Sequence, residues 1–413
     1  MNKVLDVYLH EIYAGQLIQN ESGRLLYQYD VAYVEERHPA LSISLPVQQA
    51  MFEGDVVKAF FSGLLPDDAV RTRLARYLGV SEQNPFALLK AIGGECAGAI
   101  AIYAHGEALP NSSSDDIEIL GDQKLQDILT ILKRQPLFSG DDGLRLSLAG
   151  AQDKLAVGIK DGKIALMKGT LPTTHILKPL IDDIESSVHN EFFCMRLAKL
   201  IEIKVPHVEI RYVGDIPFYL IERYDRGEDT NGKVFRIHQE DFCQALSVFP
   251  EKKYEREGGP SLARCQDLLR QHSIQPAVDG TELIKRVIYN YLIGNADAHA
   301  KNFSFLYIKD KPALSPAYDL LSTAVYPNVS IKMAMKIGGK YIPDDVLLRH
   351  WHRIVPDTTV AQKNIEKQLL AMANDCVEQA VLLREQLKRE DIESPIFDKI
   401  YDVIRKRSEH LRL

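Results

Sequence analysis

The feature that most constrains the fold is a change in hydrophobic pattern near residue 240. Between residues 144 and 225, short strand-like runs such as Leu155 to Ile159 and Ile176 to Lys178 surround a single helical stretch at 185–200. Beyond about residue 240, the apolar residues recur mostly at helical spacing. A sheet-rich segment followed by a helix-rich segment predicts two lobes with a cleft between them.

The first hundred residues predict a further α+β module. Apolar runs that begin at Val4 and Leu25 are typical of antiparallel strands, and Val57 to Leu64 and Ala69 to Leu78 have helical periodicity. The polar stretch 105–116 is typical of a linker. We therefore expect three segments: an N-terminal module at 1–106, a sheet-rich lobe at 107–240 and a helical lobe at 241–413.

Composition limits the class of protein. The 413 residues are 46% hydrophobic and 26% charged, as in ordinary folded chains. The net charge of −7 opposes binding to a phosphate backbone, so DNA contact would need a local patch or a partner. The five cysteines show no CxxC spacing, which argues against structural zinc or a disulfide framework. Without a signal peptide or a membrane-length apolar run, we expect a cytoplasmic protein.

The clearest chemical signal lies at 284–319. A helical pattern ends at Gly294, and the polar loop that follows carries Asp297 and, five residues later, Asn302. A strand–turn–strand pattern then leads to Asp319. In kinases one carboxylate accepts the hydroxyl proton, while an amide oxygen and a second carboxylate hold Mg²⁺. The spacing therefore predicts a phosphoryl-transfer site, and a polar loop capped by Asp and Asn is the alternative.

Such a site also needs a phosphate-binding loop and a cation in the sheet-rich lobe. Ser147 to Lys154 contains small residues just before a strand, but it matches neither Walker A nor GxGxxG, and a tight β-turn is the alternative. Lys178 lies in an apolar strand, where an unpaired ammonium is costly, so we expect a phosphate or carboxylate partner. Glu191 and Glu185 are the candidate carboxylates, and a solvated edge lysine is the alternative.

These blocks together resemble the HipA family of serine/threonine kinases, the toxin components of two-gene toxin–antitoxin modules. The matching blocks, in family order, are His38 to Pro46, Phe61 to Asp67, Ser147 to Lys154, Thr173 to Lys178, Ile221 to Arg226, Gly294 to Ser304, and Tyr318 with Asp319. Asp153 stands where Glu is common and Ala298 where Gly is common. The resemblance implies the α+β class, with a two-lobed protein-kinase-like fold, an additional N-terminal α+β module and a mostly helical C-terminal lobe.

The resemblance also implies a role for each candidate residue. Asp297 would be the catalytic base, Lys178 would hold the ATP phosphates, and Ser147 would be the autophosphorylation site. Asn302 and Asp319 would be the Mg²⁺ ligands. The phosphate loop would be Ala149, Gly150, Ala151, Gln152, Asp153 and Lys154; the adenine-reading hinge would be Glu222, Arg223 and Tyr224; and the remaining nucleotide contacts would be Asp225 and His299 near the ribose, together with Lys301 and Tyr318.

The function implied by the resemblance is an ATP- and Mg²⁺-dependent serine/threonine protein kinase that acts as the toxin of a type II toxin–antitoxin system. Its partner would be a small HipB-like helix-turn-helix antitoxin, as a dimer that bridges toxin subunits and brings them to operator DNA. A translation component such as glutamyl-tRNA synthetase would be the substrate. Two alternatives are a phosphotransferase for a lipid or small molecule and a non-catalytic co-repressor scaffold. A scaffold, however, has no physical need for Lys178, Asp297, Asn302 and Asp319 together.

Overall fold

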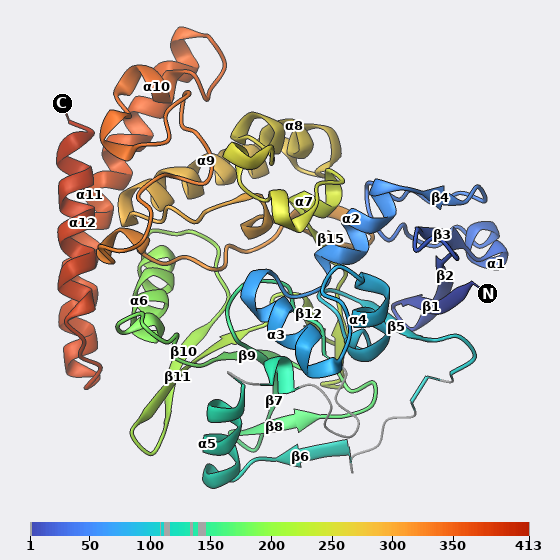
Figure 1. The fold of residues 1–413 in the computed structure, drawn as a ribbon. Helices are drawn as coiled ribbons and strands as arrows, with labels where there is room; N and C mark the ends of the chain where they lie inside the picture. The colour runs from blue at the N-terminus through green and yellow to red at the C-terminus, as the bar shows by residue number, and fades with distance from the viewer. Residues whose placement is uncertain (1, 108, 111–115, 133–134, 139–145, 413) are drawn as a thin grey trace. The chain divides into compact units, whose positions relative to one another are not determined.

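The computed structural model describes residues 2–107, 109–110, 116–132, 135–138 and 146–412. The chain forms two compact units. Figure 1 labels their helices and strands. The first contains Met1–Pro179, Arg211–Glu251 and Ser304–Pro312, and the second contains Leu180–Ile210, Lys252–Phe303 and Ala313–Leu413. Residues 108 and 111–115 of the expected linker lie outside the described ranges, and the division into three segments stays a prediction.

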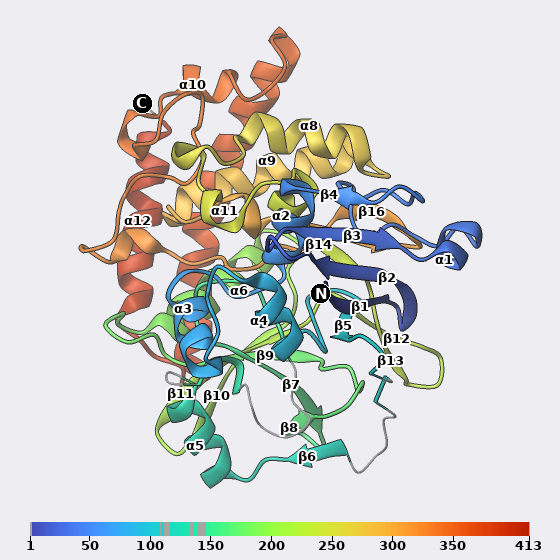
Figure 2. The ribbon, with the colours of Figure 1, turned by 45° about the vertical axis from the view of Figure 1, so that its right-hand side comes forward.

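The first unit begins with a five-stranded antiparallel sheet, seen side by side in Figure 2. Its strands are β1 (Lys3–Leu9), β2 (Ile12–Gln19), β3 (Leu25–Tyr29), β4 (Phe52–Glu53) and β5 (Ile100–Ala104), in the order β4-β3-β2-β1-β5. Four helices accompany them: α1 (Val31–Glu35), α2 (Asp55–Gly63), α3 (Asp68–Leu78) and α4 (Pro85–Ile92). The expected strands near Val4 and Leu25 and the two expected helices are therefore present.

A second, six-stranded sheet of the order β10-β11-β9-β7-β8-β6 holds the sheet-rich segment. Its strands are β6 (Ile117–Ile119), β7 (Leu155–Lys160), β8 (Lys163–Met167), β9 (His175–Lys178), β10 (Val208–Val213) and β11 (Ile216–Glu222), with α5 (Asp122–Ile131) after β6. One hydrophobic core contains residues from both sheets, among them Leu5, Val7, Leu155 and Leu177. Burying this continuous apolar surface explains why the N-terminal module and the sheet-rich segment form one compact unit.

Short elements complete the first unit. These are β12 (Arg226–Glu228) paired with β13 (Val234–Arg236), α7 (Phe242–Ala245), and a sheet of β14 (Gln239–Asp241), β15 (Ser304–Ile308) and β16 (Lys311–Leu314). β15 and β16 are the strand–turn–strand that the sequence predicts before Asp319. Asp241 caps α7 in a capping box with Gln244, which satisfies backbone N–H groups at both residues.

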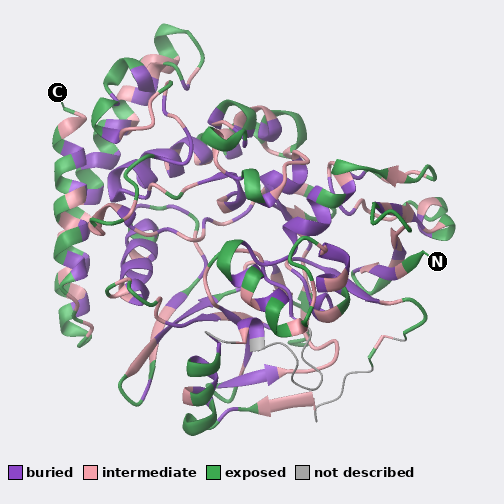
Figure 3. Cartoon of the chain, in the orientation of Figure 1, coloured by how far each residue is buried: buried purple, intermediate pink, exposed green. Residues whose placement is uncertain are grey.

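The second unit is mostly helical. It contains α6 (Ser187–Leu200), α8 (Leu262–His272), α9 (Pro276–Ile293), α10 (Leu348–His352), α11 (Thr359–Arg389) and α12 (Ile396–His410). The central helix α9 packs against α8, α11 and α12, and Figure 3 shows it mostly buried while α11 and α12 expose one face each. Within the described ranges, no helix is long and apolar enough to cross a membrane.

A buried carboxylate joins the N-terminal block at His38–Pro46 to the sheet of β14 and β15. Glu240, which is 1% exposed, accepts hydrogen bonds from the Ser42 hydroxyl, the Ile43 backbone N–H at 2.9 Å and the Tyr307 hydroxyl. Burial raises the pKa of Glu240 from 4.5 to about 7, although its three donors oppose the increase.

This carboxylate predicts a pH-dependent stability. Because the pKa of Glu240 is higher in the folded state than in the unfolded chain, the folded state binds more protons, so the free energy of unfolding should fall as the pH rises from about 4.5 to 7. A shift of this size corresponds to about 3 kcal/mol of unfolding free energy. Denaturant melts between pH 5 and 8 should show this slope, and Glu240→Gln should remove it. Parallel slopes in both proteins would contradict the prediction.

Candidate active site

The loop that carries the predicted catalytic base starts at a helix end that requires glycine. Gly294 follows α9 with φ 73°, the left-handed conformation that L residues adopt at a cost. A Cβ atom there would lie 2.6 Å from Cβ of Ala324 and 2.8 Å from Cγ1 of Val403. A side chain at position 294 would therefore clash with these two residues, and the backbone conformation is costly for any residue but glycine.

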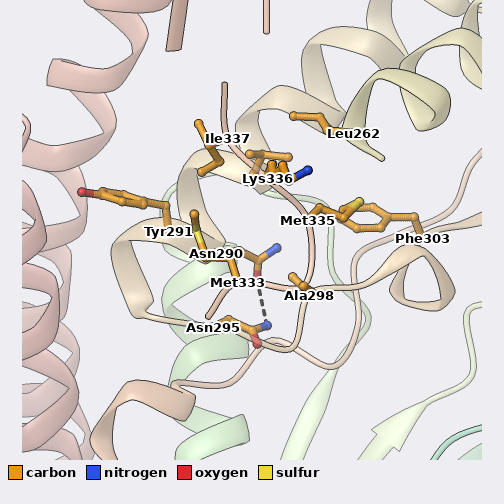
Figure 4. A pocket seen from close by; sticks show the side chains of 12 residues that line it. Leu262, Asn290, Tyr291, Asn295, Ala298, Phe303, Met333, Met335, Lys336 and Ile337 are labelled. Carbon is orange, nitrogen blue, oxygen red and sulfur yellow. Dashed lines mark hydrogen bonds between the residues drawn. The ribbon is translucent and has the colours of Figure 1, made fainter. Parts of the chain in front are cut away.

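Three polar side chains then define the path of the loop. Nδ2 of Asn295 donates to Oδ1 of Asn290 at 2.9 Å, the bond drawn in Figure 4. Oδ1 of Asn295 accepts the backbone N–H of Asp297 at 3.0 Å. On the other side, Oγ1 of Thr323 accepts the backbone N–H of Ala296 at 2.8 Å. The backbone of the loop is thus held from α9 and from the segment after Asp319.

Asp297 is exposed, as a base that must reach an incoming hydroxyl has to be. Its Oδ1 accepts a hydrogen bond from the Tyr254 hydroxyl at 2.6 Å. No described residue donates a hydrogen bond to its Oδ2. Sequence reasoning missed Tyr254, because the residue lies in a charged stretch whose sole local signal is the turn at Gly258–Pro260.

The two predicted metal ligands are neighbours. Nδ2 of Asn302 lies 3.5 Å from Oδ2 of Asp319, and Oδ1 of Asn302 accepts the backbone N–H of His299 at 3.1 Å. Asp319 has φ 51°, a costly conformation for a non-glycine residue and one that concentrates at functional sites.

This pair fits Mg²⁺ by its chemistry, since a carboxylate and an amide supply hard oxygen ligands. Across the described residues, no group of three or more His, Cys, Asp or Glu side chains could hold a metal ion. In kinases Mg²⁺ commonly keeps phosphate and water oxygens as its remaining ligands, so two protein ligands would be enough to hold it.

Three more predicted nucleotide contacts belong to the same unit. His299 and Lys301 are each 6% exposed, and the Tyr318 hydroxyl donates to the carbonyl of Lys301 at 2.7 Å. A small cavity lies beside them; its lining includes Asn295, Asn302, Tyr318 and Asp319. The second unit thus brings together Asp297, His299, Lys301, Asn302, Tyr318 and Asp319.

A second cavity, lined mainly by apolar side chains, adjoins the loop (Figure 4). It is partly open to solvent and is lined by Leu262, Val287, Asn290, Tyr291, Asn295, Ala298, Phe303 and 333–337. Its methionines, Met333 and Met335, come from a segment that sequence reasoning did not connect with the site. The backbone N–H of Ala334 donates to the carbonyl of Ala296 at 2.8 Å, so this segment supports the loop.

Lys178 belongs to the first unit. It ends β9, a strand paired on both sides, and is 4% exposed, which rules out the solvated edge lysine. Its ammonium lies 5.7 Å from the ring centroid of Tyr219 in β11. Of its candidate partners, Glu185 forms an ion pair with Lys399 at 2.7 Å, and Glu191 lies in α6 of the second unit. A pair between Lys178 and Glu191, and a site shared by Lys178 and Asp297, remain predictions.

The predicted phosphate loop is docked on the N-terminal module. Ser147 is fully buried, and its hydroxyl donates to the carbonyl of Leu64 at 2.6 Å. The carbonyl of Gly150 accepts the backbone N–H of Asp67 at 3.0 Å. Gly150 has φ 113°, and a Cβ there would lie 2.5 Å from Nζ of Lys154, which donates to the carbonyl of Ala149.

The rest of this loop makes two further contacts. Nη2 of Arg73 in α3 forms an ion pair with Oδ1 of Asp153, and the amide of Gln152 donates weakly to the carbonyl of Pro179 at 3.4 Å. Sequence reasoning noted the block Phe61–Asp67 for its resemblance alone. In the structure that block holds the loop by two hydrogen bonds, one to Ser147 and one to the backbone of Gly150.

The predicted hinge begins at Glu222, the last residue of β11. Glu222 is exposed, whereas Arg223 is 6% exposed and its backbone N–H donates to the carbonyl of Thr174 at 2.9 Å. The Tyr224 hydroxyl donates to Oε1 of Gln239. These residues remain candidates for the adenine contact.

Asp225, predicted near the ribose, is 3% exposed and lies in a buried ionic network. It accepts two hydrogen bonds from Arg223, at 2.9 and 2.8 Å, and one from the backbone N–H of Gly98 at 2.7 Å. Burial alone would raise the pKa of Asp225, but Arg223 and Arg226 outweigh it and hold that pKa well below its usual value. A ribose hydroxyl would have to share this carboxylate with both arginines.

Two families of known protein domains match this chain. The HipA N-terminal domain family matches residues 5–103, and the HipA-like C-terminal domain family matches residues 146–381. A putative kinase of Sinorhizobium fredii, Y4mE, is 38% identical over 418 residues, covering 100% of this chain and 99% of its own. The serine/threonine-protein kinase toxin HipA of Shewanella oneidensis is 31% identical over 360 residues, covering 83% and 80%.

Solved structures include the complex of Shewanella oneidensis HipA with HipB and its operator DNA. The match to that complex has a TM-score of 0.84 at 26% identity and covers 99% of this chain and 97% of the matched chain. The predicted α+β, kinase-like fold is therefore confirmed. On the two domain families and the full-length relatives together, the chain belongs to the HipA family of serine/threonine-protein kinases.

Proposed function

We propose that this kinase uses ATP and Mg²⁺ to phosphorylate a serine or threonine of another protein, and that it acts as the toxin of a toxin–antitoxin pair. The observation that carries the proposal is the arrangement in the second unit. There an exposed carboxylate, Asp297, is braced on a loop that also brings Asn302 beside Asp319. Phosphoryl transfer requires a base for the proton of the acceptor and, separately, oxygen ligands for the metal ion.

In the proposed reaction, Asp297 accepts the proton of the acceptor hydroxyl. The acceptor oxygen forms a bond to the γ-phosphorus of ATP, the bond from that phosphorus to the bridging oxygen breaks, and ADP leaves. Asn302 and Asp319 would hold Mg²⁺, which neutralises charge on the phosphates when bound. Lys178 and the loop Ala149–Lys154 would bind the phosphates, and the segment Glu222–Tyr224 the adenine.

The proposed partners follow from the family. Shewanella oneidensis HipA has been solved with HipB and its operator DNA, which supports a HipB-like antitoxin and operator DNA as partners of this chain. The antitoxin we propose is a small helix-turn-helix protein that bridges two toxin subunits as a dimer. A translation protein such as glutamyl-tRNA synthetase is the proposed acceptor. We also propose autophosphorylation at Ser147.

Labelled ATP tests the class of acceptor. The purified chain, incubated with Mg²⁺, γ-labelled ATP and a cell lysate, should place label on serine or threonine of one or a few proteins. Asp319→Asn provides the matched control, because it keeps the side-chain size and removes the charge that a metal ligand needs. Label confined to lipids or metabolites would instead establish the small-molecule phosphotransferase. No difference between the two proteins would favour the scaffold.

DNA binding provides a second prediction. At a net charge of −7, the chain alone should bind operator DNA weakly, because the summed field repels phosphates. With its antitoxin, which supplies base contacts, binding should tighten by about 10³-fold or more. Fluorescence anisotropy with labelled operator DNA at several salt concentrations measures both affinities. Tight, salt-insensitive, sequence-specific binding by the isolated chain would contradict the prediction.

A further inference from the structure

The hydroxyl of Tyr254 contacts the carboxylate to which we assign proton transfer. It donates to Oδ1 of Asp297 at 2.6 Å, although the two residues are 43 positions apart in the sequence. A hydrogen bond to an ionised acceptor is shorter and about twice as strong as one between neutral groups. The carboxylate of an exposed loop residue otherwise rotates freely, so this contact limits the orientations that Asp297 adopts.

The ring of Tyr254 is itself held in place. It meets the ring of His299 edge-on, with 5.2 Å between centroids, and the guanidinium of Arg256 lies 4.9 Å from its centroid. The carbonyl of Tyr254 accepts the backbone N–H groups of Glu257 at 3.0 Å and Gly259 at 2.9 Å. Both the ring and the backbone of Tyr254 are therefore restrained, as expected for a group that orients another.

The segment around Tyr254 is also tied to the catalytic loop through a third segment. The backbone N–H of Glu255 donates to the carbonyl of Ala334 at 3.1 Å, and the N–H of Ala334 donates to the carbonyl of Ala296 at 2.8 Å. The carboxylate of Glu255 accepts the backbone N–H of Lys336 at 2.6 Å. Figure 4 shows the segment 333–337 beside Asn295 and Ala298 of the loop. Tyr254 and Asp297 thus lie in segments of the second unit that hydrogen bonds join through residues 334–336.

We propose that Tyr254 is a positioning residue for phosphoryl transfer. Its hydroxyl holds Oδ1 of Asp297, so that Oδ2, to which no described residue donates, faces the acceptor hydroxyl. The proton of the acceptor passes to Oδ2, while Tyr254 keeps its own proton throughout. This inference rests on the proposed role of Asp297 as base. It predicts that the hydroxyl of Tyr254 affects the chemical step and leaves nucleotide binding unchanged.

Tyr254→Phe tests the proposal, since it removes the hydroxyl and keeps the ring that contacts His299 and Arg256. We expect kcat for transfer to a protein acceptor to fall about tenfold, the size expected for one charge-assisted hydrogen bond. The KM and Kd for ATP should stay unchanged, which also shows that the variant is folded. The matched control is Tyr341→Phe, because the Tyr341 ring also has a cation beside it, with Nζ of Lys336 4.9 Å from its centroid. This variant should retain full kcat.

A double-mutant cycle with Asp297 separates positioning from a general structural effect. In the Asp297→Ala background, the residual rate should be the same with Tyr254 or Phe at position 254, because no carboxylate remains to be oriented. A further tenfold loss in that background would overturn the proposal in favour of a structural role. So would an unchanged kcat for Tyr254→Phe alone, and so would an increased kcat, which would mark the hydroxyl as an occupant of the acceptor position.

The Asp297→Ala and Tyr254→Phe variants test the base and the positioning residue separately. If Asp297→Ala itself retains near-normal turnover, the proposed function of the loop fails. If Asp297→Ala is inactive and Tyr254→Phe is normal, the base assignment stands and the positioning role fails.

Discussion

Replacing Asp297 with Asn should lower phosphoryl transfer by about 10²–10⁴-fold, the usual contribution of a general base. Asparagine keeps the size of the side chain and an Oδ1 that can still accept the Tyr254 hydroxyl, so the loop and its contacts should persist. The change removes the basic oxygen that takes the acceptor proton. Single-turnover kinetics with labelled ATP and Mg²⁺ measure the loss directly.

Two controls make this result interpretable. Thermal unfolding and ATP affinity of Asp297→Asn should match those of the unmodified chain, because Asp297 is exposed and lies outside the proposed phosphate contacts. Asp319→Asn should also abolish transfer, but through a loss of Mg²⁺ affinity that raised Mg²⁺ concentrations partly reverse. An Asp297→Asn protein with near-normal turnover would refute the base assignment.

Phosphorylation of Ser147 should switch the kinase off. Ser147 is fully buried, and its hydroxyl donates to the carbonyl of Leu64, so it must leave this place to become phosphorylated. The phosphate adds about −1.5 to −2 charges and cannot return to a buried site that offers a carbonyl acceptor. The contact between Gly150 and Asp67 should then be lost as well, which releases the loop from the N-terminal module.

The size of the effect follows from the populations of the two loop states. A bias of about 3 kcal/mol against the docked loop lowers its population about a hundredfold, and ATP affinity should fall with it. Homogeneous Ser147-phosphorylated protein, compared with the unmodified form, provides the measurement by ATP titration and turnover. Equal ATP affinity and equal turnover in the two forms would reject the switch.

Ser147→Ala separates the charge of the phosphate from the loss of the hydroxyl. This variant loses one buried hydrogen bond and leaves the Leu64 carbonyl without that donor, a cost of about 1–3 kcal/mol in stability. It adds no charge, so the loop should stay docked and the kinase should remain active. Inactivity of Ser147→Ala would show that docking depends on the hydroxyl itself.

The local features of the site follow from short stretches of the sequence. The helical pattern of 284–293 and Gly294 predicted where α9 ends, and the pattern after Asn302 predicted the two strands that lead to Asp319. These predictions succeeded because hydrophobic periodicity, helix stops and turn residues act over a few positions of the chain. The same reasoning placed Lys178 in a buried strand, since an apolar run predicts burial of its neighbours.

Contacts between residues far apart in the sequence arise only when the whole chain folds. The contact between Ser147 and Leu64 spans 83 positions, and that between Tyr254 and Asp297 spans 43, so no local pattern records either. Asp225 illustrates the same limit, because the backbone N–H of Gly98, 127 positions away, donates to its carboxylate only once the chain is folded. Burial obliges polar groups to find partners wherever packing brings them, and packing is a property of the whole core rather than of a segment.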